Sequence, residues 1–215
     1  MQIETTGILI NMRPFSERDV VAHIFTRDNG VLVGMLRGAI SAKKNKPLIG
    51  QCGNVSWNAR LDSQLGVFHW EAEKNLSVPL MLNPDLLKLM NAAFALIYTL
   101  VPERESYEHL YEQTLDLLQD LSNTDFPTEK YLQWEMALLG ELGYALDLTK
   151  CSGCGRMDYL VYLSPRTGRA VCADCGEPYK DKLYKLPMSL NITERFVQSV
   201  CDAQGVDFPT ARKFL

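Results

Sequence analysis

The sequence predicts an α+β protein with a small β-barrel or sandwich first, a helical bundle next, and a C-terminal half that carries a cysteine module. Three observations predict this class: short apolar runs between turn signals in residues 1–78, helical periodicity in residues 79–150, and two Cys-x2-Cys pairs beyond residue 150. The 215 residues are 47% hydrophobic and 22% charged, which excludes a disordered chain and a coiled-coil rod. The most apolar stretch, residues 92–101, is too short to span a bilayer, and we see no secretion signal. We therefore expect a cytoplasmic protein without membrane contact.

Five apolar runs predict strands in the first third, at residues 7–12, 20–26, 31–37, 54–61 and 65–73. Asn29-Gly30 between the second and third runs indicates a hairpin, because both residues tolerate a positive φ. In the fourth run Trp57 alternates with Val55 on one face, which favours a core position for Trp57 over a base-stacking position. Five short strands suit a small barrel or sandwich, and a barrel of the oligonucleotide-binding (OB) type is one member of that set.

Helical spacing dominates the middle third. Asn83-Pro84-Asp85 supplies a capping side chain, a first-turn proline and an acid at the positive end of the first helix. A second helix is predicted over residues 105–121, and a third over about 127–145. Near the C-terminus, Asn191 is the expected cap of a helix that Gly205 stops. The expected domains are a barrel at 1–78, a helical domain at 79–150, a cysteine module at 151–176, and C-terminal helices at 177–215 that pack on the helical domain.

The charge of the chain is unevenly divided. The net charge is −4, but residues 1–78 and 151–215 each carry +2 while residues 79–150 carry −8. A basic and an acidic face can coexist because the potential decays over about a Debye length. Residues 37–46 hold four cations and no acid, a pattern that suits phosphate contacts but also an ordinary solvated loop. The candidate DNA-binding residues are those four and three further arginines: Arg37, Lys43, Lys44, Lys46, Arg13, Arg18 and Arg60.

The cysteines give the most specific motif. Cys151 and Cys154 precede Cys172 and Cys175 in the pattern C-x2-C-x17-C-x2-C. Two such knuckles can complete a tetrahedron around one Zn²⁺, and four protein ligands leave no open position, so we expect one structural zinc per chain. Disulfides or unrelated thiols are the alternatives, and a cytosolic location disfavours disulfides. Glycines next to the knuckles are expected to supply positive φ and close approach to sulfur, at Gly153, Gly155 and Gly176.

No catalytic constellation is visible in the sequence, so we predict a protein that is not an enzyme and name no catalytic residue. His23 lies in an apolar run and is expected to be packed and hydrogen-bonded; His69 is expected at a strand surface, and His109 on the acidic helix. We find no phosphate-binding Gly-Lys-Ser/Thr loop and no nucleophile elbow. Cys52 and Cys201 stand alone and are expected to be core residues rather than ligands.

Taken together, these segments resemble the RecO family of bacterial recombination mediator proteins. The resemblance spans most of the chain and rests on the order and separation of its pieces, which are residues 6–9, 13–20, 25–30, 37–39 and 146–175, with Ser164-Pro165-Arg166-Thr167-Gly168 inside the last. It implies an N-terminal OB barrel, a helical domain and a zinc module. It also implies that the basic residues of the barrel region contact DNA, above all Arg37, Lys43, Lys44 and Lys46.

The resemblance further implies a role in DNA repair and recombination. Such a protein binds single- and double-stranded DNA, anneals complementary strands, and works with RecR to load RecA on single strands coated by single-stranded DNA-binding protein (SSB), whose C-terminal tail it contacts. We expect a monomer associated with the nucleoid. Two other hypotheses stay open from the residues: a zinc-stabilised interaction adaptor that uses its acidic helices and binds no DNA, and a zinc-dependent enzyme.

Overall fold

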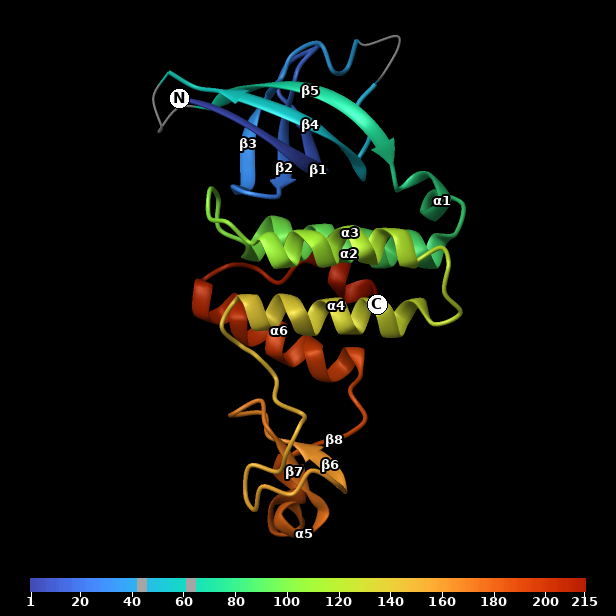
Figure 1. Cartoon of the computed structure of the whole chain (residues 1–215), viewed down its shortest axis with the longest axis vertical. Coiled ribbons are helices and arrows are strands. Elements are labelled where there is room, and N and C mark those ends of the chain that lie inside the picture. Colours follow the sequence, from blue (N-terminus) through green and yellow to red (C-terminus); the bar gives the residue numbers. More distant parts are fainter. Residues whose placement is uncertain (42–45, 61–64) are drawn as a thin grey trace. The chain divides into compact units, whose positions relative to one another are not determined.

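The computed structural model describes residues 1–41, 46–60 and 65–215, and the chain forms two compact units (Figure 1). The first unit comprises residues 1–130 and 209–215, and the second comprises residues 131–208. The α+β class is confirmed, with strands first, helices next and a small sheet near the cysteines. Within the described ranges, none of the helices has the length and apolar character needed to cross a membrane.

A closed barrel forms the N-terminal part of the first unit. Its strands are β1 (Gln2–Pro14), β2 (Val20–Thr26), β3 (Gly30–Leu36), β4 (Gln51–Asn58) and β5 (Gly66–Asn75), in the order β1-β2-β3-β5-β4. β1 pairs with β4 through its first half and with β2 through its second half, with a register shift between Leu9 and Asn11. The shift bends the strand, so that one long strand serves two sides of the barrel. β3 and β5 pair in parallel over three residues each, and this pairing closes the barrel.

Trp57 lies in the core of this barrel, as its alternation predicts. Its side chain is fully buried, and its indole Nε1 donates a hydrogen bond of 2.9 Å to the carbonyl oxygen of Val33. A Cβ atom on Gly66 would lie 2.1 Å from the Trp57 ring, so glycine is required where β5 begins. The side chains that pack together in this core belong to all five strands and to the segment after β3: Leu9, Val20, Ala22, Ile24, Leu32, Leu36, Ala39, Val55, Trp57 and Phe68.

The β2–β3 hairpin forms where Asn29-Gly30 predicts it, with Gly30 at a φ of 60° and paired to Thr26. The segment before α3 then adds to this hairpin: Glu103 bridges to Gly30, and the Arg104 N–H donates to the Val31 carbonyl oxygen at 3.1 Å. The predicted start of the second helix at residue 105 is therefore wrong. Glu103 and Arg104 bond to the barrel just before it, and α3 (Glu108–Asp120) begins three residues later than predicted.

The remaining elements of the first unit are largely helical. They are α1 (Val78–Met81), α2 (Pro84–Leu100), α3, the start of α4 (Pro127–Glu141) and the 3-10 helix η2 (Thr210–Phe214). The Asn83 cap is confirmed, because its Oδ1 accepts hydrogen bonds from the N–H groups of Asp85 and Leu86. α4 ends at Glu141 rather than near residue 145, since Gly143 adopts a φ of 87° and the chain turns there.

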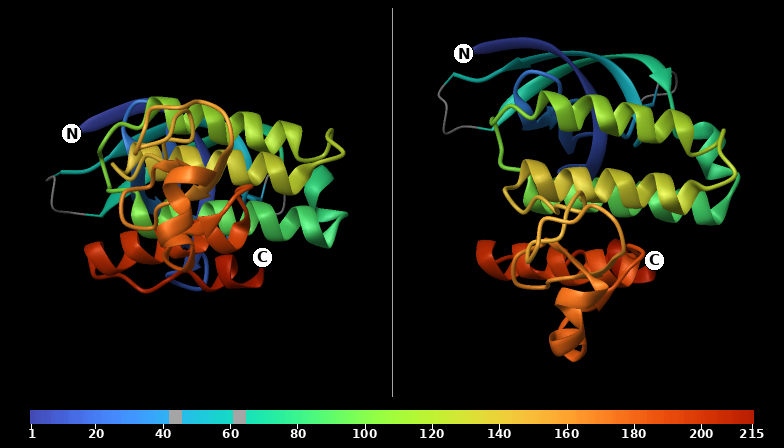
Figure 2. Two further views of the ribbon diagram at one scale, coloured as in Figure 1. Left: turned by 90° about the horizontal axis from the view of Figure 1, so that it is seen from below. Right: turned by 60° about the horizontal axis from the view of Figure 1, so that its bottom comes forward.

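In the second unit a three-stranded sheet adjoins the cysteines. It consists of β6 (Leu160–Leu163), β7 (Ala170–Cys172) and β8 (Tyr184–Lys185) in the order β7-β6-β8. Figure 2 shows these strands and α5 (Ala173–Gly176), in orange, beside α6 (Leu190–Gln204), in red. The short 3-10 helix η1 (Glu177–Lys182) follows α5.

The predicted start of α6 is wrong, and its predicted end is confirmed. The expected cap at Asn191 is wrong, because the helix begins at Leu190 and the capping position falls on Ser189. The Ser189 carbonyl oxygen accepts the N–H groups of Ile192 and Thr193. The stop at Gly205 is confirmed by its left-handed φ of 69°.

We expect Gly30→Ala to destabilise the first unit more than Gly38→Ala. Both glycines have a positive φ, which alone costs on the order of 1 kcal/mol for alanine. A Cβ at Gly30 would also lie 1.9 Å from the carbonyl oxygen of Glu105, whereas one at Gly38 meets only Ser41 Oγ at 3.9 Å. Urea unfolding of the two variants measures the difference. Equal losses of unfolding free energy would show that the Glu105 segment moves away without cost.

Candidate metal centre and nucleic-acid interface

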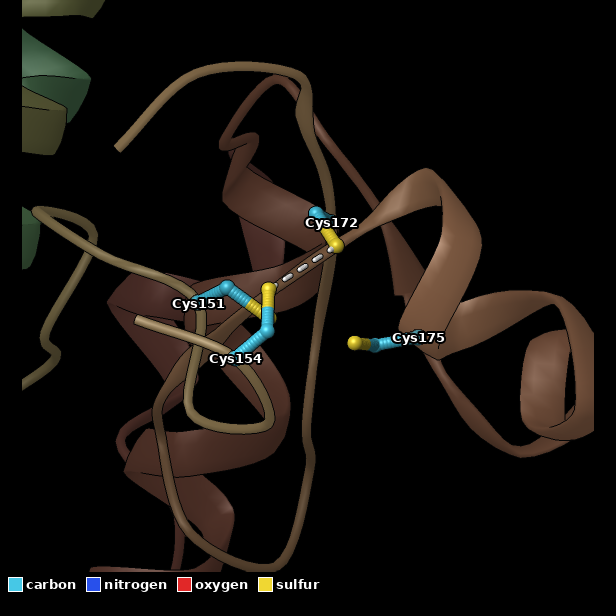
Figure 3. A group of neighbouring side chains, drawn as sticks. All are labelled: Cys151, Cys154, Cys172 and Cys175. Atoms are coloured by element: carbon cyan, nitrogen blue, oxygen red, sulfur yellow. Dashed lines mark hydrogen bonds between the residues drawn. The ribbon is translucent and has the colours of Figure 1, made fainter. Parts of the chain in front are cut away.

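Four cysteine sulfurs converge in the second unit. The Sγ atoms of Cys151, Cys154, Cys172 and Cys175 all lie within 4.8 Å of one another, and Figure 3 shows them directed toward a common centre. The Sγ atoms of Cys154 and Cys172 are 3.7 Å apart. A tetrahedral ion with metal–sulfur bonds of about 2.3 Å sets its sulfurs about 3.8 Å apart. The cluster can therefore hold a metal ion.

The first knuckle is a tight turn held by its own backbone. The Gly155 N–H donates to the Cys151 carbonyl oxygen at 2.9 Å, and the Gly153 N–H donates to Cys151 Sγ at 3.3 Å. Gly155 has a φ of 79°, as predicted. Gly153 and Gly176 do not have a positive φ, so the prediction of positive φ is wrong for these two glycines. These two glycines are needed for space instead.

Close approach explains both of those glycines. A Cβ on Gly153 would lie 3.1 Å from Cys175 Sγ, and one on Gly176 would lie 2.3 Å from the Tyr162 ring. The second knuckle joins the end of β7, which carries Cys172, to α5, which carries Cys175. An arginine that the cysteine pattern does not reveal links the two knuckles: Arg156 follows the first and pairs with Asp174 in the second at 2.9 Å.

The pKa values of two of the clustered thiols are shifted in opposite directions. Backbone N–H groups, first that of Cys172, lower the pKa of Cys151 to about 6 and so favour its thiolate. Hydrogen bonding to the neighbouring sulfurs, first that of Cys172, raises the pKa of Cys175 to about 12 and favours its thiol. Four thiolates in one cluster repel each other, and a divalent cation removes that repulsion. With four protein ligands the coordination shell is closed, which suits a structural site.

The two other cysteines lie outside this cluster. Cys201 is buried in α6, and Cys52 is partly buried in β4, where burial raises its pKa to about 11. Neither belongs to the group of metal-ligating side chains found among the described residues. Cys201 agrees with the prediction of a core residue, whereas Cys52 is only partly buried and does not belong to the barrel core.

Several predicted cationic residues gather where β1 ends, β2 begins and β3 ends. Arg18 precedes β2, and its carbonyl oxygen accepts the Ile40 N–H at 3.0 Å. Asp19 Oδ1 accepts the Gly38 N–H at 2.8 Å, which fastens the segment that carries Arg37 beside Arg18. Arg18 and Arg37 are both exposed. Lys46 is also exposed, whereas Lys43 and Lys44 lie outside the described residues.

Arg13 joins the same end of the barrel and is oriented by an aromatic residue of α2. It pairs with Val21 of β2, and its guanidinium donates to the hydroxyl of Tyr98 and lies 5.4 Å from the centre of the Tyr98 ring. The contact with Tyr98 could not be predicted from the sequence, because Tyr98 looks like one more apolar position of a helix. Arg60 is elsewhere: it follows Ala59, whose N–H bonds to the Met1 carbonyl oxygen, at the opposite end of β1.

The three histidines lie on different elements. His69 is exposed on β5 and lies 3.2 Å from Glu71, and His109 is on α3, both as expected. His23 is buried in β2 against the ring of Tyr98, but its Nδ1 has no hydrogen-bond partner among the residues that the structure describes. The expectation of a hydrogen-bonded ring is wrong for this atom. Burial, with a contribution from Arg13, lowers the His23 pKa to about 4.

Comparison with known proteins covers both halves of the chain. The family model Recombination protein O N terminal matches residues 1–72, and Recombination protein O C terminal matches residues 82–203. A DNA repair protein RecO of Rickettsia bellii is 36% identical over 193 residues, which cover 88% of this chain and 78% of that protein. Another, from Rhodospirillum centenum, is 37% identical over 191 residues, covering 87% of this chain and 76% of that protein.

The fold, the cysteine cluster and these relatives together define a protein of DNA repair and recombination. The chain belongs to the RecO family.

We expect His23 to lower the stability of the first unit as the solution becomes acidic. The folded pKa of about 4 lies below the ordinary value of 6.5, so folding favours the neutral ring. The stability that depends on the neutral ring is complete above pH 6.5 and declines as the pH falls from 6.5 toward 4. Urea unfolding at pH 7 and pH 4.5 should show a smaller loss in His23→Phe than in the wild type. The exposed His69→Phe serves as the control, and an equal loss in all three proteins would contradict the assignment.

Proposed function

We propose that this chain is a recombination mediator that binds single- and double-stranded DNA and anneals complementary strands. With RecR it helps load RecA on SSB-coated single strands, and it contacts the SSB tail. One observation carries the proposal: Arg13, Arg18 and Arg37, from three different strand ends, gather at one end of a five-stranded barrel. The relatives named DNA repair protein RecO support it.

The proposed mechanism is electrostatic. Cations at the barrel end hold the phosphates of two strands without reading bases, which lowers the repulsion between the strands and permits pairing. Lys43, Lys44 and Lys46 belong to the same loop sequence and are proposed to extend the site. Arg60, at the other end of β1, is proposed to contact a more distant phosphate. The acidic residues of α3 would keep DNA from that surface.

The cysteine cluster is proposed to bind one zinc ion with a structural role. Zinc suits four thiolates in a tetrahedron and has no redox chemistry of its own. The mediator is proposed to be a monomer in the cytoplasm, associated with the nucleoid, and to catalyse no reaction. The boundaries at residues 78, 150 and 176 are proposed to separate its barrel, helical domain, zinc module and C-terminal helices.

Replacing Arg18 and Arg37 by alanine should weaken DNA binding and reduce its salt dependence. Each phosphate contact on a single strand contributes about 0.7 to the slope of log K against log salt, so losing two should lower the slope by about 1.4. Fluorescence anisotropy with a labelled single strand at several salt concentrations measures this. Lys182→Ala with Lys185→Ala removes two exposed cations from the second unit and should leave the slope unchanged.

The outcome separates two hypotheses. An unchanged slope in the arginine variant would place the DNA site elsewhere on the chain. Failure of the wild-type protein to bind single strands even in dilute buffer would favour the adaptor that binds no DNA, for which the net charge of −8 in residues 79–150 offers a surface for a basic partner.

Metal removal should loosen the second unit while leaving the first folded. We expect elemental analysis to find one zinc per chain, with four thiols protected from a thiol reagent in the native protein. Structural zinc can contribute on the order of 10 kcal/mol to the folding of such a site, so Cys154→Ser should lose metal and expose the module to proteolysis. Cys201→Ser should keep its zinc. A metal-free protein with reactive thiols in the cluster would contradict the proposal.

A further inference from the structure

An exposed phenylalanine stands at the barrel end that carries three of the candidate arginines. Phe15 follows β1 directly and is 60% exposed. It opens the turn over residues 15–19, between the paired residues Pro14 of β1 and Val20 of β2. Single exposed apolar residues are common on protein surfaces, so exposure alone indicates nothing. Phe15 is distinguished by how firmly its backbone is held and by the charges beside it.

Asp19 holds the backbone of Phe15 in place. The Asp19 carbonyl oxygen accepts the N–H of Phe15 at 2.9 Å and that of Ser16 at 3.2 Å. The Asp19 carboxylate accepts the Ser16 hydroxyl at 3.1 Å and the Gly38 N–H at 2.8 Å. One residue therefore fixes both the turn that carries Phe15 and the segment that follows β3. A phenylalanine on a fixed backbone has little conformational freedom left to lose when a ligand covers it.

Three exposed arginines accompany this ring. Arg13 precedes it by two residues and Arg18 follows it by three, while Arg37 lies on the segment that Asp19 fastens. The carboxylate of Asp19 is occupied by its two hydrogen bonds, so Glu17 is the remaining acid of the turn. The surface therefore combines a positive charge with one flat apolar ring.

A ligand that matches this surface has to carry negative charges beside a flat apolar face. Single-stranded nucleic acid is such a ligand, because each phosphate is followed by an unpaired base, and bases of any sequence stack on aromatic side chains. In a duplex the flat faces of the bases are covered by their neighbours. An acidic peptide would need a groove for its apolar side chains, whereas Phe15 lies on a turn with most of its surface in solvent.

We propose that Phe15 is a stacking platform for one unpaired base of single-stranded DNA, with Arg18 and Arg37 holding the neighbouring phosphates. The inference rests on the proposed function, because it names the part of the DNA that the proposed site prefers. Arginines act on the phosphates of single and double strands alike, whereas the ring acts only on a base that is free to stack. Phe15 therefore gives the site a preference for single strands.

The test replaces the ring and measures binding by fluorescence anisotropy at several salt concentrations. Phe15→Ala should weaken binding of a labelled single strand roughly five- to 150-fold, the range for one stacked base. The slope of log K against log salt should stay unchanged, because no phosphate contact is lost. Binding of a duplex should also stay unchanged. Phe15→Trp keeps a stacking ring and should bind the single strand like the wild type.

An abasic oligonucleotide and a second exposed phenylalanine supply the controls. A strand with several abasic sites keeps its phosphates, so it should bind the wild type more weakly than the intact strand does, and it should not distinguish the wild type from Phe15→Ala. Phe126 precedes α4 and is 64% exposed, so Phe126→Ala removes an equally exposed ring. This control should bind every oligonucleotide like the wild type.

The outcomes separate the platform from the proposed function. Unchanged binding of the intact strand by Phe15→Ala, or an equal loss on intact, abasic and duplex DNA, would overturn the platform while DNA binding stands. If Phe15→Ala loses unfolding free energy in urea, Phe15→Trp decides: a stable tryptophan variant that does not distinguish intact from abasic strands would also overturn it. No binding of any oligonucleotide by the wild type would overturn both proposals.

Discussion

The barrel depends on a short seam. β3 and β5 meet in parallel over three residues each, and glycines occupy this seam on both strands, at Gly34 and Gly66. A Cβ on Gly34 would lie 2.9 Å from the Phe68 ring, and one on Gly66 would overlap the indole of Trp57. Trp57 and Phe68 fill the space that the glycines leave, and the Trp57 N–H bonds to β3 across it. This seam closes the barrel, and the closed barrel positions the strand ends near Arg13, Arg18 and Arg37.

Much of the fold could be predicted because its signals are local. The Asn83 cap, the hairpin at Gly30 and the helix stop at Gly205 each follow from one residue and its neighbours. The start of α3 could not, because Glu103 and Arg104 bond to a hairpin more than seventy residues earlier in the chain. The predicted cap at Asn191 lies only two residues from the observed capping position at Ser189. Serine and asparagine are both good capping residues, so the sequence alone does not choose between them.

The two candidate sites differ in the same way. The cysteine cluster could be predicted down to its four members, because a Cys-x2-Cys knuckle is built within a few residues and its geometry needs few partners. The proposed nucleic-acid interface could be predicted only as a set of cations. Its arrangement depends on contacts between distant segments, such as Arg13 with Tyr98 and the Gly38 N–H with Asp19.

Arg104 shows that the contacts of the barrel continue past its last strand. It holds a left-handed φ of 61°, bonds through its N–H to β3, and places its guanidinium 4.9 Å from the centre of the Trp57 ring. Nearby, Arg27 of the hairpin pairs with Glu108 and Glu112 of α3. A fragment that ended after β5 would lack Arg104, which covers one side of the Trp57 indole. It would also leave Arg27 without its two glutamate partners. A truncated barrel that keeps both sets of contacts therefore has to extend into α3, at least to Glu112.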